Sequence, residues 1–118
     1  METRIYDSEL KLMEMIWERG KISAKTLSLL AEERIGWNKN TTYTILKKLV
    51  EKGYVERQEP GFVCDALVSR GEVQRHETTG LLDRLFGGSK KALFSALLED
   101  ETLSKEDLSE LKRMIEER

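Results

Sequence analysis

Polar and basic side chains gather in one short stretch of the sequence, WNKNTTYTILKKLVEKG, which runs from Trp37 to Gly53. An asparagine amide can make paired hydrogen bonds to adenine, a lysine can reach guanine or phosphate, and a threonine methyl can pack on a thymine methyl. Residues 38–52 contain four lysines and one acid. This composition fits a surface that contacts nucleic acid, but an ordinary solvated helix face has the same composition.

Residues suited to catalysis or metal binding are scarce. Cys64 is the only cysteine and His76 the only histidine, so neither an internal disulfide nor a Cys-x-x-Cys metal site is possible. No nucleophile has a base placed beside it and no phosphate-binding glycine loop occurs, which argues against an enzyme and predicts no cofactor and no metal. We interpret Cys64 as a half-buried strand residue, because a reactive thiol needs an electropositive setting.

The composition is that of a helix-rich globular protein. The chain has 118 residues, 36% of them charged and 39% hydrophobic, with one proline. Its net charge is −2, although residues 1–68 carry 11 basic and 11 acidic residues. No apolar run approaches the roughly 20 residues of a transmembrane helix and no apolar signal segment opens the chain, so we expect a cytoplasmic protein without membrane contact.

Three helices are predicted in the first half of the chain. The first begins with Asp7 as N-cap, the second follows Ser23, and the third follows Asn38 within the stretch quoted above. The third helix carries an apolar stripe at i, i+3, i+4, i+7 and i+8, which predicts one buried side. The stripe consists of Thr42, Ile45, Leu46, Leu49 and Val50.

Two short β-prone runs, 54–58 and 62–68, flank Glu59-Pro60-Gly61 and predict a hairpin. Three helices followed by a hairpin is the order of a winged helix-turn-helix, a fold in which the third helix enters a DNA groove. Because the apolar stripe faces inward, other residues of the third helix face outward. We expect the DNA-binding residues to be Lys39, Asn40, Thr41, Tyr43, Thr44, Lys47 and Lys48, joined by Arg57 of the hairpin.

The pattern is helical again from Ser69 to the end of the chain. Ser69-Arg-Gly-Glu72 has the form of a capping box, and Gly87-Gly88 interrupts the helical pattern that follows. We place a domain boundary here, with a winged-helix DNA-binding domain at 1–68 and a helical dimerisation domain at 69–118. Three short helices bury little apolar surface alone, so a second copy of the chain is their simplest partner. The expected dimerisation residues are Leu81, Leu82, Leu85, Phe86, Leu93, Phe94, Leu97, Leu108, Leu111 and Ile115.

Several motifs resemble those of the penicillinase-repressor family (BlaI/MecI type). The family's recognition segment runs approximately Trp-Ser-x-x-Thr-Val-x-Thr-Leu-Leu-x-Arg-Leu-Val-x-Lys-Gly. Other matching segments are Glu9-Leu10, Ile16-Trp17, Leu67-Val68-Ser69 and the run from Leu82 to Ser89. Within the recognition segment the matching residues are Trp37, Thr41, Thr44, Leu46, Leu49, Val50, Lys52 and Gly53.

The resemblance implies a mainly α protein, with an N-terminal winged helix-turn-helix of three helices plus a short β-hairpin, followed by a helical C-terminal dimerisation region. It implies a homodimeric transcriptional repressor that binds a palindromic operator on double-stranded DNA and controls β-lactamase or other antibiotic-resistance genes. It also implies an upstream sensor-protease pathway that cleaves the C-terminal helices. Alignment on Leu103 places Ala96-Leu97 where the staphylococcal repressors carry the cleaved Asn-Phe pair, so this chain departs from the family at the expected proteolysis region.

The sequence also departs from the family pattern. Thr42 stands where the family has a branched apolar residue, and the hairpin tip, Glu59 to Phe62, is acidic where relatives often carry Lys or Arg. The copper-responsive branch (CopY type) uses a C-terminal Cys-x-Cys pair that this chain lacks. A second reading stays open, because winged helices also dock proteins: an interaction adaptor without sequence-specific DNA binding.

Overall fold

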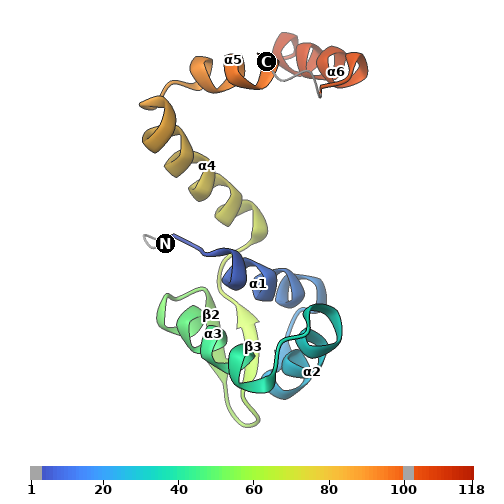
Figure 1. The fold of residues 1–118 in the computed structure, drawn as a ribbon, viewed down its shortest axis with the longest axis vertical. Helices are drawn as coiled ribbons and strands as arrows, with labels where there is room; N and C mark the ends of the chain where they lie inside the picture. The colour runs from blue at the N-terminus through green and yellow to red at the C-terminus, as the bar shows by residue number, and fades with distance from the viewer. Residues whose placement is uncertain (1–3, 100–102) are drawn as a thin grey trace. The chain divides into compact units, whose positions relative to one another are not determined.

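The computed structural model describes residues 4–99 and 103–118. The chain forms two compact units that divide between Glu77 and Thr78. The first unit holds three helices, a small sheet and the start of a fourth helix, and the second is helical (Figure 1). The helices are α1 (Asp7–Arg19), α2 (Ala24–Ile35), α3 (Lys39–Glu51), α4 (Arg70–Phe86), α5 (Lys90–Glu99) and α6 (Lys105–Glu116), and the strands are β1 (Ile22–Ser23), β2 (Val55–Gln58) and β3 (Val63–Ala66).

Capping side chains and one glycine define the turn between α2 and α3. Gly36 ends α2 with a φ of 71°, a left-handed conformation that glycine adopts without steric cost. The Asn38 side chain then accepts a hydrogen bond from the backbone N–H of Thr41 at 2.8 Å, which begins α3. Ser23 caps α2 in the same way through Thr26 at 3.1 Å. Both sequence-predicted caps are therefore present, and they fix where α3 starts.

The first helix begins one residue earlier than predicted. Asp7 is inside α1, and Tyr6 occupies the N-cap position instead. The Tyr6 N–H donates to Glu9 Oε1 at 2.9 Å, so Glu9 supplies the carboxylate that satisfies the free amide. The prediction of Asp7 as N-cap was wrong because Asp is common both at the cap and in the first turn.

The expected hairpin is present, and it forms part of a three-stranded antiparallel sheet of order β1-β3-β2. Val55 lies opposite Ala66 within the hairpin, and Ile22 of β1 lies opposite Cys64. The sequence did not predict β1, because a strand of two residues is too short to show a period-two pattern. This strand fastens the hairpin to the start of α2.

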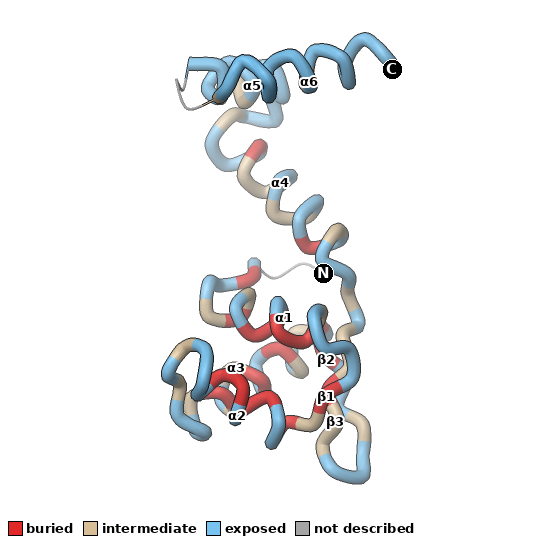
Figure 2. The backbone as a smooth tube through the Cα atoms, turned by 90° about the vertical axis from the view of Figure 1, so that its right-hand side faces the viewer, coloured by how far each residue is buried: buried red, intermediate tan, exposed pale blue. Residues whose placement is uncertain are grey.

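The core of the first unit lies between the three helices and the sheet, where the buried segments gather in Figure 2. The buried side chains come from every element of this unit, so the helices and the hairpin form one packed body. Cys64 is fully buried, not half-buried as predicted, and this burial raises the pKa of its thiol to about 11. The largest fully buried residues are Tyr54, Leu12, Met13, Ile16, Leu27, Leu46, Leu49, Glu9, Val55, Thr42 and Cys64.

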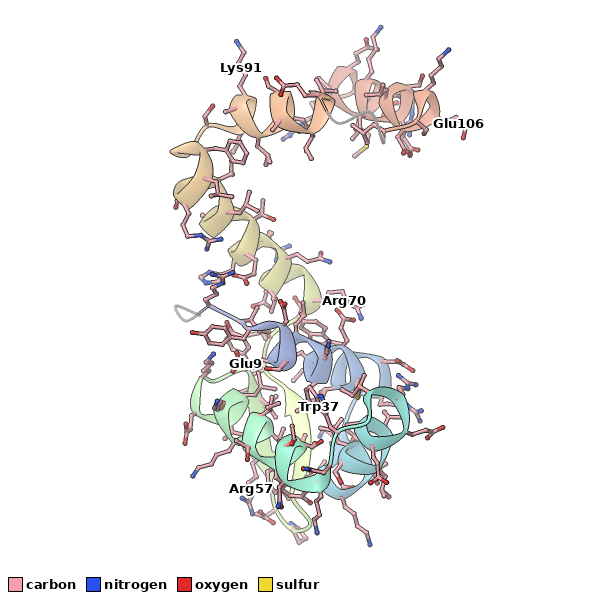
Figure 3. The ribbon with its side chains drawn as sticks, in the orientation of Figure 1. Glu9, Trp37, Arg57, Arg70, Lys91 and Glu106 are labelled. Atoms are coloured by element: carbon pink, nitrogen blue, oxygen red, sulfur yellow. The ribbon has the colours of Figure 1, made fainter. Side chains whose placement is uncertain are left out.

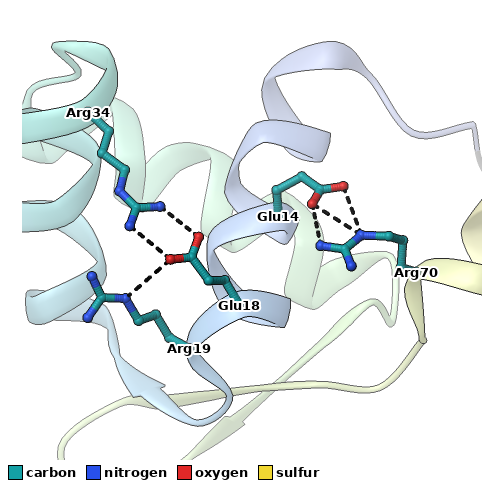
Figure 4. A network of polar contacts seen from close by, with 5 residues as sticks. All are labelled: Glu14, Glu18, Arg19, Arg34 and Arg70. Atoms are coloured by element: carbon teal, nitrogen blue, oxygen red, sulfur yellow. Dashed lines mark hydrogen bonds and ion pairs between the residues drawn. The ribbon is translucent and has the colours of Figure 1, made fainter.

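The start of α4 belongs to the first unit and is tied to α1. The predicted capping box is formed, because the Ser69 N–H donates to Glu72 Oε1 at 3.3 Å and the Glu72 N–H to Ser69 Oγ at 3.1 Å. Arg70 pairs with Glu14 of α1 through two nitrogens, as Figure 4 shows. Trp17 Nε1 donates to the Val68 carbonyl at 2.9 Å. These contacts fix the segment that follows the hairpin against α1.

Candidate nucleic-acid interface

The third helix has a buried side and an exposed side, as the sequence predicts. Thr42, Leu46 and Leu49 have no exposed surface, while Ile45 and Val50 are partly buried against the core. This buried side holds α3 on the core of the first unit, so the residues between the stripe positions face away from it. A recognition helix needs this arrangement, in which a rigid scaffold supports a polar face.

The sequence-predicted DNA-binding residues occupy the other side of α3. Tyr43 and Thr41 are partly buried. The rest of the predicted set on this helix is exposed and comprises Lys39, Asn40, Thr44, Lys47 and Lys48. Donors, acceptors and a methyl group therefore share one surface, which is the chemistry that base edges and phosphates require.

The lysines of this stretch fall into two groups. Lys39, Lys47 and Lys48 make no ion pair with any other residue in the part of the chain that the structure describes. Lys52 is different, because its Nζ lies 2.7 Å from Glu9 Oε1 and donates to the Arg4 carbonyl at 3.1 Å. Figure 3 labels Glu9 on α1. Lys52 therefore holds α1 against the end of α3, and the basic patch counted from the sequence loses one of its four lysines.

The wing, defined here as β2, β3 and the turn between them, contributes Arg57 (labelled in Figure 3). Its Nε lies 2.6 Å from Glu59 Oε1. This hydrogen bond, followed by one from the Phe62 N–H, keeps the pKa of Glu59 below its usual value. The acidic turn thus partly neutralises the one wing residue expected to contact DNA, as the departure of this turn from the family pattern suggested.

Arg57 comes together with Tyr43 and Lys47 around a hollow of about 300 Å³ between α3 and the wing. Val50 and Phe62 complete the lining. The sequence reasoning missed Phe62, because an aromatic residue beside a turn gives no signal of which helix it will touch. The structure shows it next to two residues of the predicted set.

Two further ion pairs were also missed, because their partners lie far apart in the sequence. Arg34 of α2 forms two hydrogen bonds to Glu18 of α1, at 2.8 and 2.9 Å, and Arg70 binds Glu14 (Figure 4). The Arg34 contact lowers the pKa of Glu18. These exposed pairs hold helices together and lie on α1 and α2, outside the outward face of α3.

The second unit exposes much apolar surface. Neither α5 nor α6 has a buried residue among its described positions. Of the sequence-predicted dimerisation residues, only Leu82 is buried. Leu81, Phe86, Leu93 and Leu111 are partly buried, whereas Leu85, Phe94, Leu97, Leu108 and Ile115 are exposed. Ala96 and Leu97, the expected proteolysis region, are exposed on α5.

We searched the described residues for a metal site and for a membrane-spanning helix. The described residues contain no group of three or more His, Cys, Asp or Glu side chains that could hold a metal ion. Within residues 4–99 and 103–118, no helix combines the length and the apolar character needed to cross a membrane.

Comparison with known proteins agrees with the geometry of α3 and the wing. The profile of the family described as Penicillinase repressor matches residues 5–117. The penicillinase repressor of Bacillus licheniformis is 26% identical over 116 residues, covering 97% of this chain and 91% of that protein. The methicillin resistance regulatory protein MecI of Mammaliicoccus sciuri is 22% identical over 120 residues, with 98% of each chain covered.

A solved structure supports the fold assignment. The solution structure of the DNA-binding domain of the repressor BlaI superposes with a TM-score of 0.56 at 25% identity, covering 61% of this chain and 93% of that one. The expected winged helix-turn-helix, mainly α and with a helical C-terminal region, is therefore confirmed. Together with the family match over residues 5–117, this similarity shows that the chain belongs to the penicillinase-repressor family, whose members are transcriptional repressors and not enzymes.

Proposed function

We propose that the chain binds a palindromic operator as a homodimer and thereby represses β-lactamase or other antibiotic-resistance genes. The observation that carries the proposal is the polar outer face of α3, held on a buried apolar stripe in a repressor family. The names of two relatives, a penicillinase repressor and a methicillin resistance regulatory protein, support the type of target gene.

The residues on the outer face of α3 fall into two sets in this proposal, one that contacts base edges and one that contacts phosphates. In this proposal base edges are read by Asn40, Thr41, Tyr43, Thr44 and Lys47, which lie on α3. Lys39 and Lys48 bind mainly phosphates, which set affinity and register without reading sequence. Arg57 adds a phosphate contact from the wing, weakened by its pairing with Glu59. Double-stranded DNA is then the partner, and no cofactor takes part.

The exposed apolar residues of α5 and α6 supply the reason for a homodimer. Phe94 and Leu97 are each 48% exposed and Ile115 is 63% exposed, which is unfavourable for large apolar side chains in water. A second copy of the same helices would cover these residues. A dimer would also present two α3 helices to two half-sites about one turn of DNA apart. The two-fold symmetry of such a dimer is the reason to expect a palindromic operator.

The same region would connect the repressor to its signal. Ala96 and Leu97 are exposed, so a protease of a sensor pathway would reach the α5 backbone after local opening of the helix. Cleavage there would separate α6 from the rest of the chain and weaken the dimer. In this assignment residues 1–68 bind DNA and residues 69–118 dimerise.

Selection of bound duplexes from a random DNA pool, with the full-length chain, tests the proposal. We expect a recovered palindrome whose half-sites are separated by about one helical turn. A pool that stays random after repeated rounds would instead favour the interaction adaptor. A gel shift across a salt series separates the two readings as well, because DNA binding through phosphates weakens steeply as salt rises.

A further inference from the structure

One aromatic residue of the wing, Phe62, connects the wing to the recognition helix. Its ring centroid lies 6.0 Å from that of Tyr43, with the rings nearly perpendicular at 83°. This edge-to-face geometry is one of the favoured arrangements of aromatic pairs. Tyr43 is partly buried on the outer side of α3, in the set proposed to read bases. Phe62 is also partly buried, and its side chain has no hydrogen-bonding group for a base edge.

The backbone of Phe62 is fixed on both sides. Its N–H donates to Glu59 Oε2 at 3.3 Å, and its carbonyl accepts from the Ala24 N–H at 2.8 Å. The residue has a φ of 48°, a left-handed conformation that is rare outside glycine and asparagine. This anchored backbone fixes the point from which the Phe62 side chain extends. Phe62 therefore provides Tyr43 with a fixed surface to pack against.

A second contact holds the Phe62 ring from the wing side. The guanidinium carbon of Arg57 lies 3.9 Å from the ring centroid, within cation–π range, and Glu59 holds the same guanidinium. At the other end, Lys39 Nζ lies 5.7 Å from the centroid of the Tyr43 ring. Ring and charge contacts thus form an unbroken chain from the first turn of α3 to the turn of the wing.

We propose that Phe62 is a positioning residue for sequence reading, which acts by holding the Tyr43 ring in one orientation on the recognition helix. This inference rests on the proposed DNA-binding function and adds to it a residue outside the predicted interface. Without the Phe62 ring, Tyr43 would sample several rotamers and lose side-chain freedom on binding. This entropic cost weakens the base contacts that need one orientation of the Tyr43 ring. Phosphate contacts do not need that orientation, so the cost reduces discrimination between sequences more than affinity for phosphates.

The test compares four proteins: wild type, Tyr43→Ala, Phe62→Leu and the double variant. Leucine keeps the apolar bulk and the β-carbon of Phe62 but removes the ring. Two duplexes are the probes, the palindrome recovered by selection with the full-length chain and a scrambled duplex of equal length and composition. Fluorescence anisotropy gives the affinity ratio of the two duplexes for each protein.

Phe62→Leu is expected to lower this ratio by about two- to tenfold, the range that an aromatic pair contributes beyond its burial. The affinity for scrambled DNA should stay close to that of the wild type. In the Tyr43→Ala background the same substitution should cause no further loss, because its effect passes through Tyr43. Phe62→Tyr, which keeps the ring, should retain the wild-type ratio, as should the control Leu67→Ala at the exposed position that follows β3.

Three results would overturn the positioning role. They are an unchanged ratio in Phe62→Leu, an equal loss on both duplexes, and losses that simply add in the double variant. A wild-type chain that does not distinguish the duplexes would refute the proposed function itself, and this inference with it. In the free protein, an NMR contact between the Tyr43 and Phe62 ring protons is also expected, and its absence from the wild type would count against the proposal.

Discussion

Thr44 and Lys48 lie one helical turn apart on the exposed side of α3, and we expect them to contribute differently to DNA binding. Lys48→Ala removes a charge that we propose binds phosphate, so it should weaken binding to all duplexes about equally and reduce the salt slope by about one. Thr44→Ala removes a side chain that we propose contacts a base edge, so it should lower the preference for the selected palindrome over scrambled DNA.

Anisotropy titrations of both variants on the two duplexes measure this difference. Glu33→Ala, an exposed change on α2, serves as a control outside the proposed interface. Losses of the same size on both duplexes for both variants would contradict the division into base-reading and phosphate-binding residues.

Thr42 gives a prediction about stability. Its side chain is fully buried, and Oγ1 has no hydrogen-bond partner among the described residues. A buried hydroxyl without a partner costs about 1–3 kcal/mol. Thr42→Val replaces this hydroxyl by a methyl group of similar size, and it should raise the free energy of unfolding by about 1 kcal/mol. Urea unfolding followed by circular dichroism measures the change.

The matched control is Thr44→Val on the exposed side of the same helix, where no such gain is expected. If Thr42→Val left the stability unchanged or lowered it, the hydroxyl would have to make a hydrogen bond in solution. The helical spacing of the apolar stripe predicted that Thr42 points inward. Its missing hydrogen bond could not be predicted, because this depends on which acceptors the folded core places around Oγ1.

The ion pair between Glu9 and Lys52 holds α1 to the end of α3. Glu9 is 2% exposed, and its Oε1 accepts from both the Tyr6 N–H and Lys52 Nζ. Lys52→Met would leave this carboxylate buried without a countercharge, which should lower the free energy of unfolding by about 3 kcal/mol. Glu9→Gln combined with Lys52→Met should recover part of the loss, because the buried charge is then absent.

Lys48→Met is the matched control, since Lys48 is exposed on the same helix and should change stability by less than about 0.5 kcal/mol. Chemical unfolding of the four proteins decides the question. A Lys52→Met protein as stable as Lys48→Met would mean that the pair does not hold the two helices together.

The sequence predicted most elements but few contacts between them. Ser23, Asn38 and the capping box at Ser69 predicted helix starts correctly. Each of these signals lies within four residues of the N–H group that it caps, so local sequence contains it. The position of α3 before the wing followed from element order alone. The Glu9–Lys52 and Tyr43–Phe62 contacts join residues distant in sequence, so they depend on tertiary packing that local patterns do not contain. The same reason explains why Phe62 was missed.

Dimerisation through the second unit is the prediction on which binding to a palindrome depends. Leu97→Asp places a charge on the exposed apolar face of α5, so we expect a monomer whose first unit remains folded. Binding to the selected palindrome should fall by at least tenfold, because one half-site's contacts are lost. Sedimentation equilibrium and anisotropy measure the two effects.

Ser95→Asp adds the same charge at another exposed position of α5 and should leave the dimer intact. An unaltered Leu97→Asp dimer would contradict the assignment of this face. So would a monomer that binds the palindrome as tightly as the wild type. The helical spacing of the apolar residues predicted the apolar face of α5. That a second copy of the chain covers this face is an inference from its exposure and from the family.

We propose that a dimer holds DNA through the outer faces of its two α3 helices. The most direct test is the salt dependence of binding by the full-length chain to the selected palindrome and to a shorter duplex that holds a single half-site and offers no phosphates to the second copy of α3. We expect log affinity to fall linearly with log salt concentration, about twice as steeply for the palindrome. Binding that ignores salt, or equal slopes for the two duplexes, would contradict the claim.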